Sequence, residues 1–88
     1  MLKIERIVSR ERTTLLLLGK LRDEWVDELR AELRRVRPLK GSCLNLSQLS
    51  FIDARGVELL QKFQSEGVEL SHVPPFVGAL MQLHAPRK

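Results

Sequence analysis

The sequence predicts an α/β domain in which strand-like and helix-like stretches alternate. Three helix-like stretches carry apolar residues at helical spacing: 23–37, 53–67 and 75–83. The run Leu15–Leu18 is continuously apolar, which is typical of a strand buried on both faces inside an α/β sheet. Gly and Pro separate the stretches. The predicted order is β-β-α-β-α-β-α in a single domain that spans residues 1–88.

The first two predicted strands form a hairpin. Residues Leu2–Ser9 alternate imperfectly between apolar and polar, which favours a strand at the edge of a sheet. Arg10–Arg12 is a charged turn, short enough to join two antiparallel strands. The second strand is expected over Thr13–Leu18, and Gly19 is expected to end it.

The first helix is expected between Asp23, a plausible N-cap, and Pro38, which disfavours helical geometry at the preceding residue. Asp27 and Arg30 lie three residues apart, so they are expected to pair. The apolar face that would cover the sheet consists of Trp25, Val26, Leu29, Leu33 and Val36.

The central stretch begins with a strand at Cys43–Leu46, followed by a predicted loop, Ser47–Ile52, with Leu49 and Phe51 as apolar anchors. Asp53 precedes a helical pattern and is expected to cap it. Gly67 is expected to end that helix, whose apolar face is Val57, Leu59, Leu60 and Phe63. The free N–H groups at its start are a natural site for an anion.

The C-terminal part predicts a short strand, Val68–Ser71, and a last helix. Pro75 suits the first helical position, where a missing N–H costs nothing. The tail 85–88 is expected to fray. Strand–helix–strand units take right-handed crossovers, so the last three strands should be parallel. The prediction is a mixed four-stranded sheet with three helices, in which only the N-terminal strand is antiparallel. The apolar face of the last helix is Phe76, Val77, Leu80, Met81 and Leu83.

Composition narrows the function classes. The single cysteine allows no internal disulfide, which favours a reducing compartment and a cytoplasmic location. The run Leu15–Leu18 is far too short to span a bilayer, so no membrane insertion is expected. The net charge is +4, but the densest basic group follows a helix that begins acidic, which complements the helix dipole. No specific nucleic-acid binding is therefore expected of this group, which is Arg34, Arg35, Arg37 and Lys40.

No pattern of residues indicates an enzyme. The sequence has no Gly-rich phosphate loop and no dinucleotide fingerprint. His72 and His84 lie on different elements, and Cys43 is expected to be a small core residue. No metal or cofactor is expected. For Ser47 and Ser50, local bonding to the backbone of the turn is favoured over regulatory phosphorylation.

The residues Phe51–Gly56, FIDARG, followed by VELLQKF, resemble the signature of STAS domains, a family that includes bacterial anti-sigma factor antagonists. The resemblance extends back to Leu15–Leu21 and forward to Val68–Leu83, and so covers most of the chain. Members that are switched by phosphorylation carry Ser or Thr directly after the Asp of this turn. Here that residue is Ala54, which has no hydroxyl group.

The resemblance implies a non-enzymatic, cytoplasmic interaction module that docks on a kinase-type anti-sigma factor. With Ala54 in place, binding is expected to be constitutive or controlled elsewhere. Two alternatives stay open: an accessory subunit that binds the ATPase of an ABC transporter, and a module that binds nucleotides or polyanions. A homo-oligomer is also open. The implied contact surface is Ser50, Asp53, Ala54, Arg55, Gly56 and Glu58.

Overall fold

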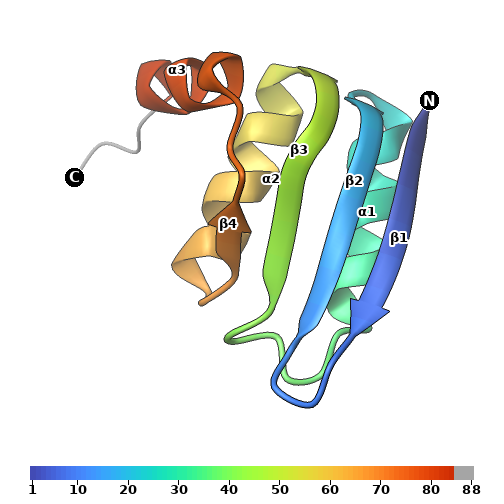
Figure 1. Cartoon of the computed structure of the whole chain (residues 1–88). Helices are drawn as coiled ribbons and strands as arrows, with labels where there is room; N and C mark the ends of the chain where they lie inside the picture. Colours follow the sequence, from blue (N-terminus) through green and yellow to red (C-terminus); the bar gives the residue numbers. More distant parts are fainter. Residues whose placement is uncertain (85–88) are drawn as a thin grey trace.

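The computed structural model describes residues 1–84 and has the predicted order of elements (Figure 1). The four strands lie in the sheet in chain order, and only the β1–β2 pair is antiparallel. The predicted tail, 85–88, lies outside the described residues. The elements are β1 (Leu2–Val8), β2 (Thr13–Leu21), α1 (Glu24–Arg34), β3 (Cys43–Ile52), α2 (Ala54–Ser65), β4 (Glu69–Ser71) and α3 (Pro75–Leu83).

Helices α1 and α2 lie on the same face of the sheet (Figure 1). Both crossovers are right-handed units between neighbouring strands, and the strand order runs in one direction, so both helices cover the same side. Leu15 and Leu17 are therefore fully buried, whereas Leu16 and Leu18 on the opposite face are only half-buried. The expectation that this run is buried on both faces was wrong.

The predicted loop Ser47–Ile52 is also wrong, because β3 continues as a strand to Ile52. The pairing with β2 shifts register twice, and each shift places one extra residue in β3. These bulges allow apolar residues three positions apart, Leu46, Leu49 and Ile52, to point into the same core. In a strand without bulges, the residues that face the core recur at every second position. The three-residue spacing of Leu46, Leu49 and Ile52 does not match that pattern, so the sequence predicted a loop here.

Strand β2 runs through Gly19 to Leu21, so the predicted break at Gly19 was wrong. Gly19 has a φ of 107°, and a Cβ atom there would lie 2.5 Å from the carbonyl oxygen of Met1. The glycine marks a close approach of two backbones within the sheet rather than the end of the strand.

The helix boundaries follow the predicted signals in most places. Helix α3 begins at Pro75, and Gly67, with a φ of 97°, follows α2. Helix α1 ends at Arg34, and Val36 beyond it still reaches the core. Most of the core lies between the sheet and the helices α1 and α2, and its largest fully buried side chains are Leu15, Leu17, Leu21, Leu29, Leu33, Leu44, Leu46, Leu59 and Leu60.

Candidate functional site at the start of helix α2

Asp53 joins the start of α2 to the turn that precedes α1. Its Oδ1 atom accepts a hydrogen bond from the N–H of Gly56 at 2.8 Å, which is the predicted N-cap. Its Oδ2 atom accepts a second bond from the N–H of Asp23 at 2.9 Å. The N–H of Asp53 donates to the carbonyl of Leu21 at 3.1 Å. One half-buried carboxylate thus fixes two helix starts at the carboxyl ends of β2 and β3.

Asp23 does not cap α1 with its side chain, contrary to prediction. Its backbone has a φ of 51° and a ψ of −129°, and its carboxylate pairs with the Nε atom of Arg22 at 2.9 Å. The N–H of Trp25 donates to the carbonyl of Arg22, so Asp23 is the second residue of a tight turn. A positive φ at a residue other than glycine stores strain, and such strain concentrates at functional sites.

Three of the predicted contact residues, Ala54, Arg55 and Glu58, lie exposed on the first turns of α2. Among residues 1–84, the N–H groups of Ala54 and Arg55 have no hydrogen-bond acceptor, as is usual at a helix start. The guanidinium of Arg55 lies 3.3 Å from Asp27 of α1, which also binds Arg30 at 2.7 Å. The Asp27–Arg30 pair was predicted, whereas the pairing with Arg55 was not, because the fold alone brings these residues together.

Gly56 is buried, so it shapes the site without facing a partner. A Cβ atom at this position would lie 2.7 Å from Cγ1 of Ile52 and 3.0 Å from the carbonyl oxygen of Leu21. The glycine therefore lets α2 start close against the ends of β2 and β3. Ser50 is exposed in the second bulge, and its hydroxyl donates to the carbonyl of Gly19 at 3.0 Å. The Ser50 hydroxyl thus bonds to backbone, as expected, but to the neighbouring strand β2 rather than to the local turn.

Phe51 was predicted to be an apolar anchor, but the residue is 43% exposed. The bulge at Ser50 turns Leu49 and Ile52 into the core and leaves Phe51 on the open face. The guanidinium of Arg22 lies 5.8 Å from the centre of the Phe51 ring, within the range of a cation–π contact. Phe51 and Arg22 therefore lie beside the predicted contact residues and enlarge the exposed surface at the start of α2. The sequence alone could indicate them only if the register of β3 on β2 were known.

The described residues contain little else that suggests chemistry. Among residues 1–84 there is no group of three or more His, Cys, Asp and Glu side chains that could hold a metal ion. His72 and His84 are both exposed and lie on either side of α3. Cys43 is buried, with its thiol 3.2 Å from the Ser71 hydroxyl. Within the same residues, no helix is long and apolar enough to cross a membrane.

Comparison with known proteins identifies the fold. No protein-family model matches the chain, and no curated protein matches its sequence. Among solved structures, the anti-sigma factor antagonist SpoIIAA in its unphosphorylated form is similar with a TM-score of 0.71 and 23% identity, over 94% of this chain and 83% of that one. The Bacillus cell fate determinant SpoIIAA in its phosphorylated form gives a TM-score of 0.70 and 23% identity. That match covers 97% of this chain and 84% of the other chain.

A third similar structure is the STAS domain of an anti-sigma factor antagonist from Rhodobacter sphaeroides. It has a TM-score of 0.60 and 20% identity, over 78% of this chain and 84% of that one. The matches span most of both chains in all three cases. The chain therefore has the STAS-domain fold, as the signature residues predicted.

Proposed function

We propose that this chain is a regulatory protein-interaction module that binds a partner protein through the start of α2, as an anti-sigma factor antagonist would. The observation that carries the proposal is the α2 corner, defined as Phe51, Ala54, Arg55 and Glu58 with Arg22. It is exposed, yet it rests on a rigid base made by Asp53 and Gly56. A surface that is exposed but fixed in shape loses little entropy on binding.

The proposed module does not switch by phosphorylation at Ala54, which offers no hydroxyl group. Ser50 is the nearest serine to the corner, and its hydroxyl is engaged with Gly19. Incubation with ATP and the cognate kinase should leave the chain unmodified at this corner. Mass spectrometry of the tryptic peptides would detect any added phosphate group. A phosphopeptide containing Ser47 or Ser50 would contradict the proposal that the module is not switched by phosphorylation.

Affinity capture tests the proposed partner. The immobilised chain is incubated with lysate of its source organism beside two charge-reversal variants on α2: Arg55→Glu in the corner, and Lys62→Glu further along the helix. Both side chains are exposed, so both variants should fold. We expect an anti-sigma factor with a kinase domain to be retained by the wild type and by Lys62→Glu, and lost with Arg55→Glu.

Two outcomes would contradict this function. If Arg55→Glu retained the anti-sigma factor as well as the wild type does, the α2 corner would not be the binding surface. If the wild type retained the ATPase of an ABC transporter instead, the chain would be an accessory subunit of that transporter. A purified partner then allows the affinity of each variant to be measured by calorimetry.

A further inference from the structure

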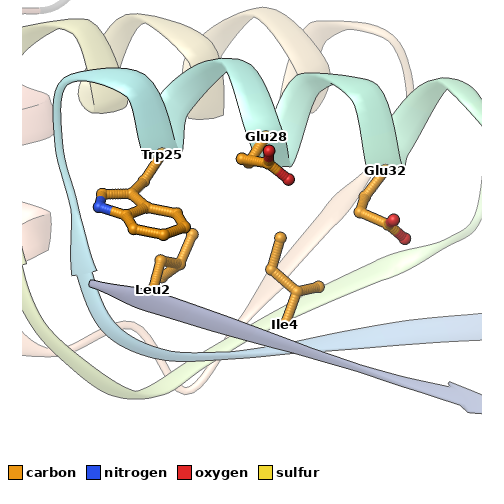
Figure 2. A pocket seen from close by; sticks show the side chains of 5 residues that line it. All are labelled: Leu2, Ile4, Trp25, Glu28 and Glu32. Carbon is orange, nitrogen blue, oxygen red and sulfur yellow. The ribbon is translucent and has the colours of Figure 1, made fainter.

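A groove of about 240 Å³ lies between the edge strand β1 and helix α1 (Figure 2). Leu2 and Ile4 point into it from the strand, and Trp25, Glu28 and Glu32 point into it from the helix (Figure 2). Because the three helix residues are spaced i, i+3 and i+7, they form one stripe along α1. The groove lies outside the α2 corner and shares no residue with it.

The groove combines an apolar floor with two glutamates at its rim, of which only Glu28 is unpaired among residues 1–84. Leu2 is buried, and Ile4 and Trp25 are half-buried against the core. Glu32 is already neutralised, because it lies 3.6 Å from Arg6 and 3.3 Å from Arg35.

Glu28 is the second carboxylate of the rim, and it is exposed. Among residues 1–84, Glu28 pairs with no cation. Because Arg6 and Arg35 balance Glu32, Glu28 is the one unpaired charge that lines the groove among residues 1–84.

Strand β1 has a free edge next to this groove, since its only neighbour in the sheet formed by residues 1–84 is β2. At the two ends of the pair, Lys20 N–H donates to the carbonyl of Met1, and Ser9 N–H donates to that of Arg12. Hydrogen-bonded pairs alternate in an antiparallel ladder, so the odd-numbered residues of β1 bond to β2. The backbone groups of Leu2, Ile4 and Arg6 consequently face the free edge.

We propose that an extended segment of a partner protein pairs with the free edge of β1 and places a lysine or arginine side chain in the groove. A residue directly opposite Ile4 in an added strand would have its side chain on the same face as Ile4, beneath α1. The aliphatic stem of a lysine or arginine would then lie along Leu2 and Ile4, and its charged end would reach Glu28. The Trp25 ring offers the same cation an aromatic face.

A second copy of this chain is a poor occupant by the same reasoning. An antiparallel pairing of two β1 strands centred on Ile4 would place the two α1 stripes side by side. Glu28 would then face the Glu28 of the other copy, and juxtaposed like charges disfavour an association. Charge complementarity therefore selects a basic segment from another protein.

Trp25 provides a direct readout, because it is the only tryptophan and the chain has no tyrosine. The probe is the peptide acetyl-Thr-Val-Thr-Lys-Thr-Val-Thr-amide, whose lysine would lie opposite Ile4 with valines on the same face. The matched peptide carries norleucine instead of lysine. We expect the Trp25 emission to change in a saturable manner, with roughly tenfold tighter binding of the lysine peptide at low salt, as a charge-assisted hydrogen bond would give.

Two variants and one exchange measurement locate the interaction. Glu28→Gln should remove the preference for lysine, whereas Glu66→Gln, an equal charge change at the end of α2, should preserve it. Amide hydrogen exchange at Ile4 should slow on binding of the peptide. Exchange at Lys3 and Glu5, whose N–H groups bond to β2, should stay unchanged.

Four results would overturn the proposal. These are no emission change with either peptide, equal affinity for both peptides, full lysine preference in Glu28→Gln, or no added protection at Ile4. If raising the concentration of the chain alone protected Ile4 and changed the Trp25 emission, a second copy would occupy the groove. If the Arg55→Glu variant bound the lysine peptide with the same change in Trp25 emission, the groove would act independently of the α2 corner.

Discussion

The carboxylate of Asp53 binds the backbone N–H of Asp23 at 2.9 Å, so the last residue before α2 holds the last residue before α1. The same carboxylate caps α2 through Gly56. Two helices that cover one face of the sheet are thereby tied at their starts by a single side chain.

Replacing Asp53 by alanine should lower the free energy of unfolding by about 2–3 kcal/mol, because it leaves two backbone donors without a charged acceptor. Asp53→Asn should lose less, since its one amide oxygen can still accept from Gly56. Urea denaturation followed by circular dichroism measures both variants. Equal stability of Asp53→Ala and the wild type would show that the hydrogen bonds from Asp23 and Gly56 to the Asp53 carboxylate do not stabilise the fold.

Asp23→Gly should raise the free energy of unfolding by about 1 kcal/mol. Asp23 has a φ of 51°, a conformation that costs other residues energy and costs glycine little. The N–H that binds Asp53 is retained in this variant. Asp23→Ala keeps the positive φ and should give no such gain. The midpoints of urea denaturation of the two variants measure this difference. A loss of stability in Asp23→Gly would contradict the presence of backbone strain at Asp23.

Gly56→Ala should destabilise the fold by about 1–3 kcal/mol, because its methyl group would meet Ile52 and the backbone of Leu21 at 3.0 Å or less. Gly78→Ala is the matched control in α3, where the nearest atom lies 4.0 Å away. This control should stabilise the fold by about 0.5–1 kcal/mol, since alanine favours a helix. Thermal melts of both variants should therefore shift in opposite directions.

Arg55→Glu should change the free energy of unfolding by no more than about 0.5 kcal/mol. The Arg55–Asp27 pair is lost, but the Arg55 side chain is 55% exposed and such pairs contribute little. A glutamate in the first turn of α2 also interacts favourably with the helix dipole. Chemical denaturation checks this expectation. A large loss would mean that Arg55 is structural, and its use as a binding variant would be invalid.

The fold could be predicted because its strongest signals are local. The apolar periodicity of α1 and α2, the glycine after α2 and the proline at the start of α3 each specify one element. The right-handed crossover rule then orders the parallel strands. These signals do not depend on the details of strand register, so errors within β3 left the topology prediction intact.

The arrangement of side chains at the candidate site was predicted less completely, because it depends on the bulges in β3. An extra residue changes which side chains face the core, so Phe51 was expected inside and lies outside. The contact between Asp53 and Asp23 joins residues on separate elements, and no spacing pattern reveals it. Asp53 itself was found because a helix cap has a local signature.

The strand order β1-β2-β3-β4 has a consequence for how the chain folds. Each strand pairs only with strands that are adjacent to it along the sequence, so no strand must wait for a distant segment before it can join the sheet. The β1–β2 hairpin closes a short loop, and the paired residues of the parallel strands lie 26 to 31 positions apart. Loops of this length keep the entropic cost of closure moderate, because that cost grows only slowly with loop length. The chain can therefore extend its sheet progressively from the hairpin, and we expect refolding after dilution from urea to be fast for a sheet-containing domain.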